Sequence, residues 1–184
     1  MKFVIIHGIH THGKGIDQLG ALLEKAGHDV TYFEYPKRWA LTLYRKSVRH
    51  ADGRALMHTV PDGTHVIAHS YGALVLLSSI QAGAIWGNCF IFGGACTSDK
   101  YTYPPDAFTS AYMIYNPADL ALRLGALLPF HPFGRLGQRG YAGYVRDRRI
   151  QNVPALENDL GINHSHYFRA GMREYWCKFI LDRL

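Results

Sequence analysis

A serine, a carboxylate and a histidine each follow a different apolar segment of this sequence. Ser70 lies in "THVIAHSYGALVLL" (64–77), between a short β-branched segment and a longer apolar one, while Asp119 lies in "YNPADLALRL" and His164 in "INHSHYF". A serine hydroxyl becomes a nucleophile when a base removes its proton, and a histidine that is oriented by a carboxylate is such a base. The three residue types therefore indicate acyl-transfer chemistry.

Alternating strand and helix patterns must position these residues. Short apolar runs predict strands at 2–6, 29–35, 65–68, 88–94 and 110–116, with a sixth candidate at 144–153, and helical spacing predicts helices within 15–28, 40–60, 71–83 and 166–184. This alternation predicts one α/β domain over residues 1–184, a three-layer α/β/α sandwich without a large cap domain. Its sheet would be mostly parallel, with about five or six strands. Ligands bind at the carboxyl ends of such strands, where the serine, acid and histidine all lie.

The chain order serine, acid, histidine resembles that of the α/β-hydrolase superfamily, and in particular its small lipase-like and esterase-like serine hydrolases. The family pattern Gly-x-Ser-x-Gly is matched by "AHSYG" (68–72), in which Ala68 is a mild departure. Small residues flank the serine because the turn from strand to helix is strained and neighbouring backbone passes close by. The segment "VIIHGIH" (4–10) is similar to the His-Gly that the family often carries after its first core strand.

The resemblance implies a role for each residue around the serine. Ser70 would be the nucleophile, and the backbone N–H groups of Tyr71 and Ile9 would form the oxyanion hole. Tyr71 would lie at a helix N-terminus, where unpaired donors and the helix dipole favour negative charge. Gly8 would allow the loop to approach closely, and His7 would be structural.

The acid is expected to be Asp119, which follows the predicted strand 110–116 much as the acid does in lipase-like hydrolases. Asp99 and Asp106 are the fallback, since some family members place the acid after the preceding strand. A second interpretation is that Asp119 only caps a helix, because aspartate before an apolar run is a favourable N-cap.

Two histidines compete for the role of the base. The similarity to the family's final loop favours His164, and His166 would then be an exposed cap or a wall of the site. His69 should point away from the pocket and is better interpreted as a packed residue. We nevertheless include His10, His69, Leu120 and His166 as candidate substrate-binding residues.

No cofactor or metal is expected. His7, His10 and His12 alternate along one loop, but no aspartate, glutamate or cysteine joins them in sequence. The three cysteines have no metal-ligand spacing, and a disulfide framework is unexpected.

The substrate is expected to be a small carboxylic ester. The segment 120–144 is rich in Leu, Phe, Gly and Pro and either forms an apolar wall over an acyl pocket or packs against the core. A thioesterase or amidase on the same triad remains an alternative. So does a non-catalytic module that binds an anionic partner through the basic segments 37–50 and 144–151, since the net charge is +6. Nucleic acid is not expected as a partner.

Composition predicts a globular protein without a transmembrane segment. Hydrophobic residues make up 48% and charged residues 18% of the chain, and no apolar run reaches the roughly 18 residues that a membrane helix needs. The apolar patch at the start breaks at His7, too early for a signal peptide, so we expect a cytoplasmic protein. The oligomeric state is left open.

Overall fold

A six-stranded parallel sheet forms the centre of the molecule. The computed structural model describes residues 1–9, 15–36, 42, 45–96, 103–125, 134–143, 146–155 and 164–184. The strands lie in the order β2-β1-β3-β4-β5-β6, and every neighbouring pair is parallel. Their bounds are β1 Lys2–Ile6, β2 Asp29–Phe33, β3 His65–His69, β4 Trp86–Phe92, β5 Phe108–Tyr115 and β6 Ile150–Pro154. The predicted α/β class and mostly parallel sheet are confirmed.

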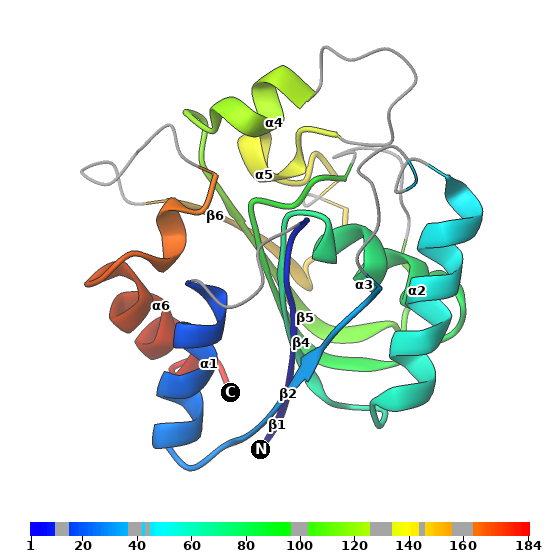
Figure 1. Cartoon of the computed structure of the whole chain (residues 1–184), viewed down its shortest axis with the longest axis horizontal. Coiled ribbons are helices and arrows are strands. Elements are labelled where there is room, and N and C mark those ends of the chain that lie inside the picture. Colours follow the sequence, from blue (N-terminus) through cyan, green and yellow to red (C-terminus); the bar gives the residue numbers. More distant parts are fainter. Residues whose placement is uncertain are drawn as a thin grey trace.

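Helices cover both faces of the sheet, which gives the predicted three layers (Figure 1). The helices α1 (Ile16–Lys25) and α6 (Met172–Leu181) lie on one face, and α2 (Lys46–Thr59) and α3 (Gly72–Gln81) lie on the other. Two short helices, α4 (Leu120–Gly125) and α5 (Leu136–Arg139), lie beyond the carboxyl ends of the strands. A 3₁₀ turn, η3 (His166–Phe168), precedes α6.

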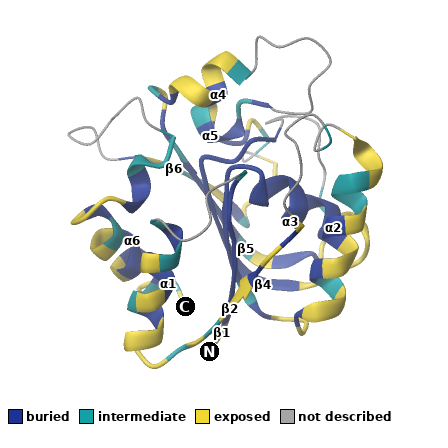
Figure 2. Ribbon diagram, viewed as in Figure 1, coloured by how far each residue is buried: buried dark blue, intermediate teal, exposed yellow. Residues whose placement is uncertain are grey.

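Each face of the sheet has its own hydrophobic core. Along β1, Val4 and Ile6 belong to the cluster under α2 and α3, while Phe3 and Ile5 belong to the cluster under α1 and α6. All seven residues of β4 are buried, as expected for a strand that is covered on both faces. Figure 2 shows the inner strands of the sheet as buried, while the edge strand β2 and the outer faces of the helices are exposed.

Several boundaries differ from the predictions for local reasons. The predicted helix 166–184 is interrupted, because Gly171 adopts a φ of 84° and α6 begins only after it. The sixth strand occupies the end of its predicted range, and β4 begins earlier than predicted because Trp86 already pairs with Phe108. Of the predicted helical range 40–60, residues 46–59 are helical; 40, 41, 43 and 44 lie outside the described residues. Within the described ranges, no helix is both long and apolar enough to cross a membrane.

Candidate active site

Ser70 lies in a strained turn between β3 and α3. Its φ of 56° makes it the one non-glycine residue with a positive φ in the described part of the chain. A left-handed backbone costs an L-residue roughly 1–2 kcal/mol, and such strain is concentrated at functional sites. Two hydrogen bonds hold the turn: the Ser70 N–H donates to the Phe92 carbonyl at 3.1 Å, and the Ala95 N–H donates to the Ser70 carbonyl at 3.0 Å.

The small residues around the serine allow close backbone approach. A Cβ atom at Gly72 would collide with the carbonyl oxygen of Ile6, so a glycine is required where α3 starts against β1. Ala68 is completely buried in the core, pairs with Ile6 of β1, and is accommodated there as the mild departure from the family's glycine. Backbone therefore passes close to Gly72, as the sequence suggested for the small residues of this motif.

Asp119 and His164 are in direct hydrogen-bond contact. The Nδ1 of His164 donates to Oδ2 of Asp119 at 2.5 Å, and the carboxylate is completely buried. The other oxygen, Oδ1, accepts the backbone N–H of Leu122 at 3.0 Å. Asp119 therefore caps α4 and orients the histidine at once, and the two interpretations drawn from sequence are compatible. Because Nδ1 carries the proton, Nε2 of the neutral ring is the acceptor that a base requires.

The alternative acids are placed differently. Asp106 is an exposed residue in the turn before β5, and Asp99 lies outside the described residues. Asn116 prepares the loop that carries Asp119: its Oδ1 accepts the Ala118 N–H at 2.9 Å, which forms a tight turn directly after β5.

His69 supports the loop that carries His164. Its Nε2 donates to the His164 carbonyl at 3.1 Å, and the two rings lie 4.8 Å apart between centroids. His69 is 1% exposed, and its ring meets that of Phe168 edge to face. Burial, with the neighbouring His164, lowers the pKa of His69 to about 3, so the ring is neutral at physiological pH. His69 is thus buried, as expected for the packed residue favoured from sequence.

The residues at the end of β4 lie next to both Ser70 and His164. Phe92 and Ala95 bond to the backbone of Ser70, and a Cβ atom at Gly93, between them, would lie 3.1 Å from Cε1 of His164. Gly93 has a φ of 53° and lies at this contact because a side chain would displace the imidazole.

The remaining predicted site residues differ in how far they are buried and in where they lie. Ile9 lies three residues after the end of β1 and is partly buried. Leu120 is 40% exposed at the start of α4, and His166 begins η3. Nε2 of His166 is buried without a hydrogen-bond partner in the described structure. His10 lies outside the described residues. Among the residues described, no group of three His, Cys, Asp or Glu side chains could hold a metal ion.

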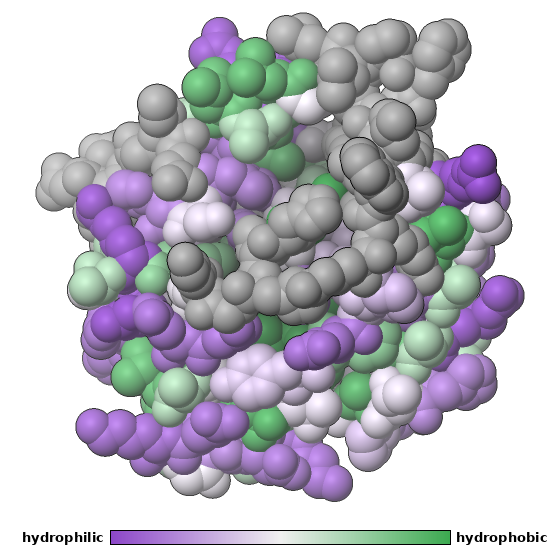
Figure 3. Space-filling view, in the orientation of Figure 1, coloured by the Kyte–Doolittle hydropathy of each residue, from purple (hydrophilic) through white to green (hydrophobic). Residues whose placement is uncertain are grey.

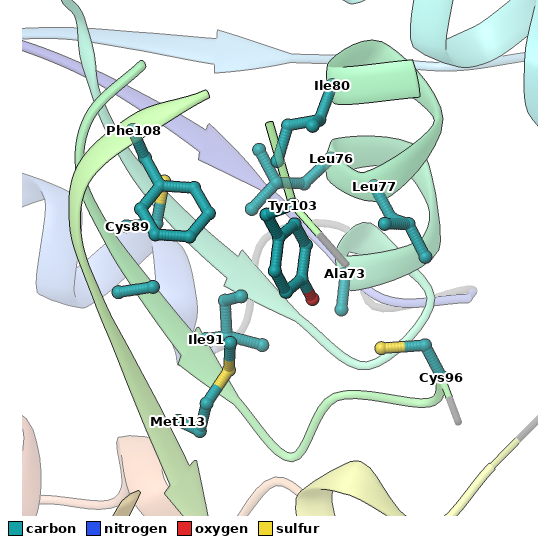
Figure 4. A pocket seen from close by; sticks show the side chains of 11 residues that line it. Ala73, Leu76, Leu77, Ile80, Cys89, Ile91, Cys96, Tyr103, Phe108 and Met113 are labelled. Carbon is teal, nitrogen blue, oxygen red and sulfur yellow. The ribbon is translucent and has the colours of Figure 1, made fainter. Parts of the chain in front are cut away.

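An apolar pocket borders the first turns of α3. Ala73, Leu76 and Ile80 point from α3 towards Ile91, Met113 and Phe108 of the sheet, with Tyr103 and Cys96 at its side (Figure 4). The space left between these side chains is at most enough for one water molecule. It is therefore a packing gap of the core, and an acyl chain would not enter it without movement of its walls.

The sequence analysis did not identify the polar groups that lie behind the site. Asp52 is 2% exposed on α2, and its Oδ2 accepts the hydroxyl of Tyr71 at 3.2 Å. The hydroxyl of Tyr35 donates to the Gly8 carbonyl at 2.7 Å. One signal was available: Asp52 lies four residues before Leu56, on the buried side of α2.

Comparisons with solved structures identify the fold. The ydeN gene product of B. subtilis aligns over 98% of this chain and 100% of its own length, with a TM-score of 0.61 and 14% identity. A putative YdeN-like hydrolase from Pectobacterium atrosepticum aligns over 98% and 89%, with a TM-score of 0.57 and 15% identity. An extracellular α/β-hydrolase from a Paenibacillus species aligns over 95% and 85%, with a TM-score of 0.50 and 17% identity.

No protein-family model and no curated protein sequence matches the chain. The fold assignment thus depends on the structural alignments, which extend over nearly the whole chain, and on the six-stranded parallel sheet with helices on both faces. Both agree with the resemblance that the sequence carries. The chain has the fold of the α/β-hydrolase superfamily.

Proposed function

We propose that this protein is a serine hydrolase that cleaves a carboxylic ester through an acyl-enzyme on Ser70. The observation that carries the proposal is the 2.5 Å contact between His164 Nδ1 and the buried Asp119, at the same edge of the sheet as the strained Ser70. Buried charges are costly unless they are paired, so an aspartate that is fully buried against a histidine favours a functional role.

In the first step, the Ser70 hydroxyl attacks the ester carbonyl carbon while Nε2 of His164 takes its proton. The carbonyl oxygen becomes an oxyanion, and the N–H groups of Ile9 and Tyr71 would stabilise it. Asp119 stabilises the imidazolium ion that forms and keeps its proton on Nδ1. The alcohol then leaves with the proton that His164 returns, and the acyl group stays on Ser70.

In the second step, water replaces the alcohol. Nε2 of His164 takes a proton from the water as its oxygen attacks the acyl-enzyme, and the proton returns to the Ser70 oxygen when the carboxylic acid leaves. The reaction needs no cofactor, since all proton transfers use the same histidine.

The exposed apolar residues of α4 favour an apolar acyl group. Leu120 is 40% and Leu124 is 55% exposed, and Figure 3 shows hydrophobic side chains gathered over this helix. α4 follows Asp119 directly, so these leucines lie on the edge where the substrate would bind. Since the core pocket beside α3 is nearly filled, we propose a shallow site for a short acyl chain.

A basic pocket between α2 and α3 supports the second candidate, the binding of an anionic partner. Lys46, Arg49 and His50 line it together with Ser78 and Gln81 of α3. Burial and these neighbouring cations lower the pKa of His50, so the lysine and arginine supply its charge near neutral pH. An anion held there could equally be part of the leaving group of an ester substrate.

The test is turnover of p-nitrophenyl acetate, butyrate and octanoate by wild type, Ser70→Ala and the exposed-serine control Ser47→Ala. We expect hydrolysis by wild type and Ser47→Ala, loss in Ser70→Ala, and a preference for the shorter chains. Matched acyl thioesters measured in parallel separate the esterase from the thioesterase. Equal background rates in all three proteins would contradict the hydrolase proposal and favour the anion-binding module.

A further inference from the structure

Four buried side chains form a connected polar group directly beneath the two predicted oxyanion donors. They are His7, Tyr35, Asp52 and Tyr71, which come from four different segments of the chain, and each is less than 8% exposed. The Tyr35 ring lies 4.4 Å from the ring of His7 and 5.3 Å from that of Tyr71. The Tyr71 hydroxyl donates to Asp52. We call this group the tyrosine network.

The tyrosine network fixes the carbonyl of Gly8 from two sides. Nδ1 of His7 donates to the Gly8 oxygen at 2.7 Å, and the Tyr35 hydroxyl donates to the same oxygen at 2.7 Å. The hydroxyl also lies 3.2 Å from the carbonyl oxygen of His7. A carbonyl oxygen has two lone pairs, and here both are used by buried donors.

The position of this carbonyl determines where the Ile9 N–H points. The Gly8 C=O and the Ile9 N–H belong to one planar peptide unit, and no described peptide bond is cis. In a trans peptide the C=O and N–H point in opposite directions. Because the oxygen is held towards Tyr35 in the core, the N–H is directed away from the core. No hydrogen bond from this N–H to another described residue is present.

The Tyr35 hydroxyl is well suited to remain a fixed donor. The residue is 7% exposed, and burial, together with Tyr71 and Asp52, raises the pKa of its hydroxyl far above the usual value. The hydroxyl therefore keeps its proton near neutral pH. Its ring is clamped between His7 and Tyr71, which restricts its rotation.

We infer that Tyr35, together with His7, is a positioning residue that aims the Ile9 N–H at the developing oxyanion. The inference depends on the proposed function, because it requires an acyl-transfer reaction at Ser70. Tyr35 would not touch the substrate. It would act through the Gly8–Ile9 peptide. The second predicted donor is the N–H of Tyr71, and the hydrogen bond from the Tyr71 hydroxyl to Asp52 would hold that residue in place.

A positioning role predicts a particular kinetic signature. Oxyanion-hole donors are placed for the oxygen of the tetrahedral intermediate and contribute little to binding of the ground-state carbonyl. Misdirection of one donor should therefore lower kcat and leave KM nearly unchanged. It should also weaken a boronic acid that forms a tetrahedral adduct with the serine, by the same factor as kcat.

The experiment compares wild type, Tyr35→Phe and the control Tyr112→Phe. Tyr112 is a similarly buried tyrosine on β5, whose ring stacks on Phe90 on the α1–α6 face. For Tyr35→Phe we expect kcat to fall about tenfold or more, short of the 10²–10³-fold loss of a whole donor, with KM within twofold. Affinity for phenylboronic acid should fall in parallel, and Tyr112→Phe should match wild type in all three quantities.

Each result decides the inference separately from the function. If wild type turns over through Ser70 and Tyr35→Phe keeps its kcat and boronate affinity, the inference is overturned and the hydrolase stands. If kcat and KM change together, Tyr35 has a merely structural role, which also overturns it. If wild type shows no Ser70-dependent turnover, the proposed function and the inference both fail.

A second variant covers the case in which Tyr35→Phe does not fold. His7→Phe removes the other donor to the Gly8 oxygen and keeps an aromatic ring against Tyr35. The same fall in kcat and boronate affinity at constant KM is expected. Wild-type values in a folded His7→Phe protein would overturn the inference.

Discussion

The two faces of the sheet support the candidate site with different kinds of contact. On the α1–α6 face, aromatic rings pack around the His69 ring, which lies next to His164. On the α2–α3 face, hydrogen bonds join the side chains that lie next to Ser70 and Ile9. Phe92 meets Trp176 edge to face at 5.3 Å, and His69 meets Phe168 in the same way at 5.1 Å. On the other face, Tyr35 and Tyr71 place their hydroxyls on a carbonyl and a carboxylate. The same edge of the sheet is thus supported in two ways.

The difference corresponds to what each side must hold. A base has to be kept at a location, and on the α1–α6 face dense packing of large rings adds to the two hydrogen bonds that hold His164, one to Asp119 and one from His69. An oxyanion donor is a dipole that must be aimed, and only directional contacts to its own peptide fix its angle. On this account, damage to the ring side should appear chiefly as lost stability, and damage to the hydrogen-bonded side chiefly as lost rate.

The largest expected effect lies at the junction of the two sides, in Asp119→Asn. An amide keeps an acceptor for the Leu122 N–H but presents the wrong partner to His164 Nδ1. We expect kcat on p-nitrophenyl esters to fall by about 10⁴-fold with little change in unfolding temperature. Asp106→Asn is the matched control and should retain wild-type kcat. Loss of activity in the control alone would reassign the acid.

Trp176→Ala tests the aromatic packing on the α1–α6 face. Trp176 is completely buried in the aromatic cluster, so its removal leaves a cavity and should lower the free energy of unfolding by about 3–5 kcal/mol. Its neighbour Tyr175 is 40% exposed, and Tyr175→Ala should change stability by less than about 1 kcal/mol. Urea denaturation measures both. A free energy of unfolding near that of wild type in Trp176→Ala would show that aromatic packing does not stabilise the α1–α6 face.

The buried His69 should make stability depend on pH. Its pKa is lowered to about 3, whereas in the unfolded chain it is near 6.5, so protons bind the unfolded state first as the pH falls. Above about pH 6.5, His69 is neutral in both states and does not lower the free energy of unfolding. Between about pH 6.5 and pH 3, each unit of decrease in pH lowers the free energy of unfolding by up to about 1.4 kcal/mol.

Urea midpoints at pH 7, 6 and 5 measure this dependence. The slope should flatten in His69→Gln, which keeps a donor for the His164 carbonyl but does not titrate. The exposed His58→Gln serves as the control and should keep the wild-type slope. An unchanged slope in His69→Gln would mean that other groups cause the pH dependence.

The smallest expected effect is the stability change in Tyr71→Phe. Removal of the hydroxyl takes one donor from Asp52 and keeps the ring contact with Tyr35. We expect a loss of about 1 kcal/mol in the free energy of unfolding, the typical net value of a hydrogen bond. A loss as large as that of Trp176→Ala would erase the proposed difference between the two faces.

Much of the fold follows from local sequence patterns. The segment 2–6 was predicted as a strand and is β1 at the same residues, because its β-branched run suits a strand that is buried on both faces. The positions of Ser70, Asp119 and His164 after strands follow from the same patterns. The break at Gly171 was not predicted, because the apolar stripe runs on from Phe168 to Met172 and does not mark the residue after which α6 begins.

The supporting residues could not be predicted because they depend on which segments meet in space. Nothing near Tyr35 in sequence indicates that its hydroxyl reaches the Gly8 carbonyl, 27 residues away. The contact of His69 with the His164 carbonyl joins residues 95 apart. Residue type and spacing suggest candidate reacting groups, but the contacts that position such groups emerge only from the packed structure.

The central claim is that Ser70 is an activated nucleophile whose base is His164. Intact mass after treatment with a fluorophosphonate probe tests this on wild type, Ser70→Ala, His164→Ala and His166→Ala. The account predicts a single adduct on wild type and His166→Ala, none on Ser70→Ala, and strongly slowed labelling of His164→Ala. A folded wild-type protein that takes no adduct, or an adduct that persists in Ser70→Ala, would contradict it.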